Sequence, residues 1–152
     1  MIKIIAIGKN NDKNLGALLA DYQQRIAHFH KLEIVEIPER GSTKETALTI
    51  DQQSQEILKR IKESEYVILL DLSGEMLDSL TFAGKLETWL STQANLCFII
   101  GGSQGVNAAL KKRADCKWCL AKVTFPHLLV RLLLLEQIYR AFKINAHQSY
   151  HK

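Results

Sequence analysis

The sequence is short of cysteine, and it has no apolar run long enough to cross a membrane. Its three cysteines are an odd number, which does not suit a disulfide framework and fits a reducing compartment. The longest apolar run, residues 128–135, contains Arg131 and is followed at once by Glu136, which excludes a membrane span. The apolar stretch at the N-terminus is too short for a secretion signal. We therefore expect a cytoplasmic protein without a membrane partner.

Two nucleotide-binding signatures are missing as well. The glycines at positions 101, 102 and 105 are not followed by Gly-Lys-Ser/Thr, so they do not form a P-loop for phosphate. The first expected strand ends in Gly8-Lys9-Asn10, where a dinucleotide-binding fold would carry GxGxxG. A nicotinamide or ATP cofactor is therefore not expected.

The C-x-x-C pair of Cys116 and Cys119 has no second pair to match it. Zinc would need two further ligands, so we expect no metal. A thiol redox site is the other use of this spacing. It is disfavoured because the pair precedes an expected strand instead of opening a helix, so no helix N-terminus lowers a thiol pKa. Both cysteines fit better as small apolar residues.

The chain does contain enough apolar sequence for one full core. With 152 residues and 47% apolar content, residues 1–152 are expected to form a single domain. The net charge of +4 and the isoelectric point near 9.0 favour an anionic partner, although many basic proteins bind no nucleic acid.

Strands are expected to alternate with helices along the chain. The β-branched run at 2–7 is typical of a strand buried on both faces of a parallel sheet, and further strands are expected at 32–37, 66–70, 96–100 and 118–123. A helix is expected from Asn14, with Leu15, Leu18, Leu19, Tyr22 and Ile26 at helical spacing, and others at 47–62, 81–92, 108–114 and 127–144. Residues 38–45 and 71–75 have loop or turn composition. This order predicts an α/β fold with a mainly parallel sheet and helices on both faces.

The helix expected at 127–144 is apolar around most of its circumference. Its polar residues form one narrow stripe of Glu136, Arg140 and Lys143, so the helix needs two burying partners. One partner could be the sheet, and the other a second subunit or domain. Arg131 lies outside the stripe, where an unpaired charge would be costly. Arg131 should have an anionic partner or line a site; the alternative is a side chain that reaches water at the helix edge.

Three expected strands end in turn-forming sequence, at 70–75, 101–105 and 120–127. Ligands bind beyond the carboxyl ends of the strands in open α/β sheets, so these segments form the candidate site. Gly101, Gly102 and Gly105 would let the backbone approach a ligand closely. The simpler reading of such glycines is a turn without a ligand.

The chain resembles the RlmH family of SPOUT methyltransferases over its whole length. The resemblance is sharpest in FIIGGSQGV (98–106), in KVTFPHLLVRLLLLEQIYRAFKI (122–144) and in the ending Tyr150-His151-Lys152. It implies a parallel α/β sheet with a SPOUT-type C-terminal trefoil knot, a homodimer and S-adenosylmethionine as cofactor. It also implies methylation of N3 of a pseudouridine in large-subunit (23S) ribosomal RNA, in the assembled ribosome.

The resemblance also implies roles for individual residues. The cofactor-binding residues that the resemblance implies are Leu70, Gly101, Leu120, Ala121, Lys122, Val123, Thr124 and Phe125. Gly102 and Gly105 are expected to join them, because they belong to the same glycine turn. The residues expected at or near the reacting atoms are His127, Arg131, Tyr150 and His151. His151 is the proposed general base, and His127 is the alternative. RNA contacts are expected from Arg140, Lys111, Lys112 and Arg113. Cys119 and Ala121 stand where relatives commonly have serines, and Gln148-Ser149 replaces a common His-Pro.

Two other classes of function fit parts of the pattern. An RNA-binding protein without catalysis would bind RNA but would show no saturable binding of S-adenosylmethionine. A thiol oxidoreductase would lose its activity on alkylation of Cys116 and Cys119. The glycine turn and the KVTFPH segment favour the methyltransferase over both.

Overall fold

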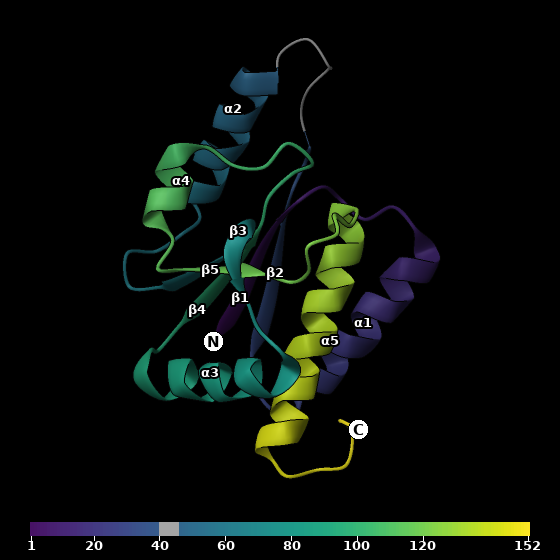
Figure 1. Cartoon of the computed structure of the whole chain (residues 1–152). Helices are drawn as coiled ribbons and strands as arrows, with labels where there is room; N and C mark the ends of the chain where they lie inside the picture. Colours follow the sequence, from purple (N-terminus) through teal and green to yellow (C-terminus); the bar gives the residue numbers. More distant parts are fainter. Residues whose placement is uncertain (40–45) are drawn as a thin grey trace.

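The computed structural model describes residues 1–39 and 46–152, which form a five-stranded sheet flanked by helices (Figure 1). The strands are β1 (Ile2–Ile7), β2 (Leu32–Ile37), β3 (Tyr66–Met76), β4 (Leu96–Ile100) and β5 (Cys116–Cys119). The helices are α1 (Lys13–Ala27), α2 (Thr46–Leu58), α3 (Ser79–Thr92), α4 (Ala108–Arg113) and α5 (His127–Asn145). The predicted alternation of strands and helices is confirmed.

The sheet has the strand order β2-β1-β4-β3-β5, and every pairing between these strands is parallel. The central strands β1 and β4 are buried along their whole length, as expected of strands covered on both faces. The predicted parallel α/β fold is therefore confirmed. The trefoil knot stays a prediction.

Side chains of alternating direction supply two separate cores, one on each face of the sheet. On β1, Ile2, Ile4 and Ala6 face a core shared with α1, α3 and α5, whereas Ile5 and Ile7 face a core shared with α2 and α4. Figure 1 shows the same division of the helices between the two sides of the sheet. Helices on both faces, predicted from the sequence, are confirmed. None of the described helices is long and apolar enough to span a membrane.

Three helices begin with a side-chain cap that fixes where the chain turns into helix. Asp12 accepts from the amide of Leu15, Asp78 from that of Thr81, and Asn107 from that of Leu110. Each cap satisfies one of the amides that an α-helix leaves without a partner at its start. Helix α5 has no such cap and instead follows Pro126, whose missing N–H costs little at this position.

Several predicted boundaries are wrong. Residues 71–75 are part of β3, because Leu70 and Glu75 both pair with Trp118 and the chain between them forms an irregularity within the strand. Strand β5 covers Cys116–Cys119, so the C-x-x-C pair is the strand and residues 120–123 follow it. Helix α2 ends at Leu58, before the predicted end at residue 62.

One predicted buried side chain is also wrong, because Leu18, predicted on the buried side of α1, is 49% exposed. Most of the loop predicted at 38–45 lies outside the described residues.

The irregularity in β3 requires a glycine at position 74. A Cβ on Gly74 would lie 2.6 Å from the carbonyl carbon of Lys117 and from the amide nitrogen of Trp118. Gly74→Ala should therefore lower the free energy of unfolding by about 1–3 kcal/mol, because backbone atoms must shift to make room. Urea unfolding followed by circular dichroism measures this change. A matched control is Gly84→Ala at an exposed position of α3, where a Cβ meets nothing within 4 Å and helix propensity favours alanine.

Candidate functional site

A cavity of about 610 Å³ lies at the carboxyl ends of β3, β4 and β5. All predicted cofactor-binding residues except Lys122 line it: Leu70, Gly101, Gly102, Gly105, Leu120, Ala121, Val123, Thr124 and Phe125. Five further lining residues belong to the segments predicted as the candidate site but were not predicted individually as site residues: Asp71, Leu72, Ser103, Gln104 and Pro126. Other lining residues lie outside those segments and were not predicted: Ile100, Val106, Trp118, Cys119 and Val130. Three separate segments of the sequence therefore meet at one site, as expected from parallel strands whose ends lie at one edge.

The turn after β4 brings backbone close to this cavity. The amide of Gly105 donates to the carbonyl of Gly102 at 3.0 Å, and Gly105 has a φ of +85°, which a residue with a side chain rarely adopts. A Cβ on Gly101 would lie 2.8 Å from Cγ1 of Val106. The shape of this turn therefore requires glycine at positions 101 and 105.

Arg131 is fully buried, and its partner is acidic. Its Nη1 donates to Oε1 of Glu36 at 3.0 Å, and its Nη2 donates to the carbonyl of Gly8 at 2.7 Å. The predicted anionic partner is confirmed, and the alternative of a side chain reaching water is wrong. Arg131 does not line the cavity. Its guanidinium instead ties α5 to the ends of β1 and β2.

His127, the first residue of α5, does line the cavity. Its ring packs against Gly8, which has a φ of +94° and where a Cβ would collide with the imidazole. Nε2 of His127 lies 3.6 Å from Oε2 of Glu39, and the Ser103 hydroxyl donates to Oε1 of the same carboxylate at 3.3 Å. Glu39 thus connects the start of α5 with the glycine turn. Glu39 could not be identified from the sequence, because the contacts join segments far apart in the chain.

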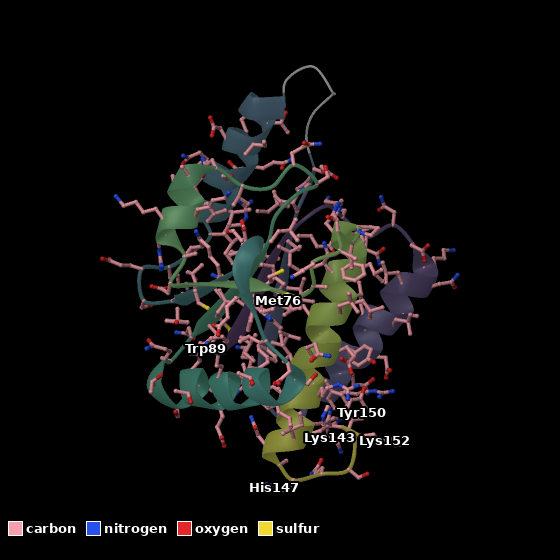
Figure 2. All side chains as sticks on the ribbon, in the orientation of Figure 1. Met76, Trp89, Lys143, His147, Tyr150 and Lys152 are labelled. Atoms are coloured by element: carbon pink, nitrogen blue, oxygen red, sulfur yellow. The ribbon has the colours of Figure 1, made fainter. Side chains whose placement is uncertain are left out.

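The C-terminal tail folds back along α5, and Figure 2 shows Tyr150 beside that helix after the turn at His147. The Tyr150 hydroxyl donates to Oε1 of Glu136 at 3.2 Å, and the guanidinium of Arg140 lies 4.8 Å from the centre of the Tyr150 ring. Burial and the neighbouring Glu136 and Tyr22 raise the pKa of Tyr150. The phenol is therefore neutral at physiological pH and serves as a donor.

His151 lies in a second cavity of about 520 Å³, which shares Trp118, Leu120, Ala121 and Phe125 with the first. Arg140 holds its ring, with Nη1 lying 3.1 Å from Nδ1 of His151, while Nε and Nη2 of Arg140 bind Glu136. Because arginine only donates, Nδ1 is the acceptor and the neutral ring carries its proton on Nε2. Within one chain, therefore, the structure brings His127 to the first cavity and His151 to the neighbouring one.

The basic residues of α4 do not share one role. Lys111 and Lys112 are exposed. The Nη2 of Arg113 donates to the carbonyls of Lys62 and Glu65 at 3.1 and 2.9 Å, and its Nη1 pairs with Asp115 at 3.2 Å. Arg113 therefore anchors the chain that leads into β3. Lys111 lies 3.9 Å from the carboxylate of Asp71, whereas Lys112 pairs with no carboxylate in the described part of the chain.

The cysteines show no features of a redox site. Cys97, Cys116 and Cys119 are all free thiols, and the C-x-x-C pair lies along one strand. Burial raises the pKa of Cys97 to about 12 and also raises that of Cys116, which disfavours the reactive thiolate. The described residues contain no group of three or more His, Cys, Asp or Glu side chains that could hold a metal ion.

The parallel sheet, the glycine turn and the cavity at the strand ends can now be compared with known proteins. Residues 1–151 match the family described as predicted SPOUT methyltransferase. The chain belongs to the SPOUT methyltransferase family and is an enzyme of that class.

Curated relatives make the comparison more specific. Proteins named ribosomal RNA large subunit methyltransferase H from Ruminiclostridium cellulolyticum and Clostridium kluyveri are each 42% identical to this chain. The protein of the same name from Alkaliphilus oremlandii is 43% identical. Each alignment covers 99% of both chains. The resemblance to the RlmH family is thereby confirmed over the full length.

Proposed function

We propose that this protein transfers a methyl group from S-adenosylmethionine to N3 of a pseudouridine in large-subunit (23S) ribosomal RNA. The substrate would be the assembled ribosome, and the enzyme would act in the cytoplasm as a homodimer. The observation that carries the proposal is the convergence of the three segments that resemble the RlmH family on one cavity or its immediate neighbour. The names of the full-length relatives support the same substrate class.

The cavity suits a nucleoside-containing methyl donor. Its volume of about 610 Å³ falls within the range of small-molecule sites, and most of its wall is apolar, with Leu70, Leu120 and Phe125 among its members. Backbone groups of the glycine turn at 101–105 are available for polar atoms of the ligand. Bound S-adenosylmethionine would supply an activated methyl group, so the chain itself needs no covalent nucleophile.

The contribution of the chain is then to orient the reactants and to remove a proton. Alignment of a nucleophile with the methyl group can lower a barrier by about 7–11 kcal/mol. We assign the proton acceptor to His151, which would act once Arg140 leaves Nδ1. A phosphate of the RNA is a suitable competing partner for the Arg140 guanidinium. Binding of the RNA would in this way free the base.

A second protomer is part of the proposal. Exposed apolar side chains next to the two cavities include Leu72, Leu80 and Val123, at 64%, 59% and 62% exposure. Burial of such side chains in a homodimer would remove them from water. It could also bring the tail of one protomer, with Tyr150 and His151, to the first cavity of the other.

Lys111 and Lys112 are the exposed cations proposed to attract RNA. Contacts between lysine and phosphate release counterions, so RNA affinity should fall as salt is added. Replacing both lysines by glutamine should weaken ribosome binding and reduce this salt dependence.

The decisive experiment offers labelled S-adenosylmethionine to the protein with two substrates, ribosomes and free ribosomal RNA that both lack the modification. Label on one pseudouridine, with ribosomes preferred over free RNA, would support the proposal. RNA binding without saturable binding of S-adenosylmethionine would instead identify an RNA-binding protein without catalysis. Loss of activity in Cys116→Ser, whose side chain lies outside the cavity, would favour the thiol alternative.

A further inference from the structure

One acidic side chain faces the cavity at the point where the regular part of β3 ends. Asp71 follows Leu70 directly, lines the cavity, and has a side chain that is 15% exposed. Among the described residues that line the cavity, Asp71 is the one carboxylate, and none is a lysine or an arginine. The cavity therefore has an apolar wall with a single negative charge.

The carboxylate of Asp71 is held in place from one side. Its Oδ1 accepts from the amide and the hydroxyl of Ser73 at 2.8 and 2.6 Å. Its Oδ2 forms no hydrogen bond within the described part of the chain, and the ammonium of Lys111 lies 3.9 Å away. Burial alone would raise the pKa of Asp71, but the Ser73 contacts and nearby Lys111 hold the pKa below its usual value. Asp71 is thus a fixed, ionised group with one oxygen available.

A sulfonium ion is the kind of charge that such a group can stabilise. It carries a positive charge but no N–H, so it needs a nearby negative charge and no set of acceptors. An ammonium group has three donors to satisfy, and Asp71 has one oxygen left. Attraction between opposite charges is also stronger beside an apolar wall than in water.

We infer that Asp71 is a specificity-determining residue that holds the positive charge at the reacting sulfur of the methyl donor. This inference rests on the proposed function, since it concerns the cavity proposed for S-adenosylmethionine. Transfer of the methyl group leaves a neutral sulfur, so Asp71 favours the donor over the product, S-adenosylhomocysteine. The sulfonium charge is already partly lost in the transition state. Removing the carboxylate should therefore raise KM for the donor without lowering kcat.

The test compares three ligands by isothermal titration calorimetry on the wild type and on Asp71→Asn. The ligands are S-adenosylmethionine, sinefungin and S-adenosylhomocysteine. Sinefungin has a carbon bearing a charged amino group in place of the methylated sulfur, and S-adenosylhomocysteine has a neutral sulfur. Asp71→Asn keeps the shape and the acceptor for Ser73 but removes the charge. We expect the Kd for the two cationic ligands to rise about tenfold and that for S-adenosylhomocysteine to change less than about twofold. Glu75→Gln is the matched control, because Glu75 is on the same strand but pairs with Lys85 outside the cavity.

Equal weakening of all three ligands would overturn the inference, because Asp71 would then only maintain the cavity. Unchanged affinity for all three would overturn it as well. Failure of the wild type to bind any of them would overturn the proposed function together with this inference. Steady-state kinetics give a second readout, in which KM for the donor should rise about tenfold while kcat does not fall.

Discussion

Replacing His151 by alanine should reduce methyl transfer about 100-fold or more while leaving the binding of S-adenosylmethionine unchanged. The reason is chemical, since N3 of the base must lose its proton before or during transfer. His151 lies beside the segment 120–125, which borders both cavities, and its ring is held by Arg140. The measurement is a single-turnover rate with saturating cofactor and unmodified ribosomes, together with a cofactor titration of the same variant.

His147→Asn is the matched control for a change in the tail. His147 is exposed and has a φ of 53°, a conformation that asparagine tolerates better than most residues. This variant should therefore keep the tail geometry and the wild-type rate. Full activity of His151→Ala would remove His151 from the mechanism, and His127, which lines the first cavity beside Glu39, would be the next candidate.

The second large effect is expected for the buried ion pair. Arg131→Met should lower the free energy of unfolding by about 2–3 kcal/mol, because Glu36 and the carbonyl of Gly8 both lose their donor. The value is at the lower end for a buried pair because the Glu36 side chain is 35% exposed and keeps some contact with water. Guanidinium chloride unfolding of the variant and the wild type gives this difference.

Two further variants separate the causes of this loss. Adding Glu36→Gln to Arg131→Met should restore part of the stability, because the uncompensated charge is removed. Arg25→Met should cost little, since its pair with Asp21 is on the exposed surface of α1. If Arg131→Met unfolds like the wild type but loses cofactor binding, Arg131 acts at the site as the sequence analysis predicted, and the structural role is wrong.

The fold was largely predictable because its elements carry strong local signals. The β-branched run 2–7 and the fully apolar run 96–100 are strands with the predicted bounds, and α5 begins at the predicted His127. The errors have one physical source. Residues 71–75 have the composition of a turn, yet backbone pairing with β5 extends the strand through them. Pairing with a distant strand is not visible in local composition.

The candidate site was predicted to a similar extent. The strand-end rule and the family resemblance selected Leu70, Gly101 and the segment after β5, and most of these residues line the cavity. Asp71 belongs to the predicted segment 70–75, but it was not predicted as a cofactor contact because its place depends on an irregular strand. Glu39 was missed because its place depends on a contact between distant loops. Arg131 was recognised as a charge in need of a partner, but nothing in the sequence identified that partner as Glu36.

The position of β1 in the sheet affects how the chain can acquire its structure during synthesis. Strand β1 pairs with β4 in the register Ile2 to Leu96, and the N-terminal amine donates to the carbonyl of Ala94 at 3.0 Å. A contact between residues so far apart slows folding, because a long loop must close before the pairing contributes. Strand β1 is synthesised before β4, so its pairing with β4 cannot form until the residues of β4 have also been made. Until then β1 can pair with β2 alone, which leaves its other edge open to contacts with other chains.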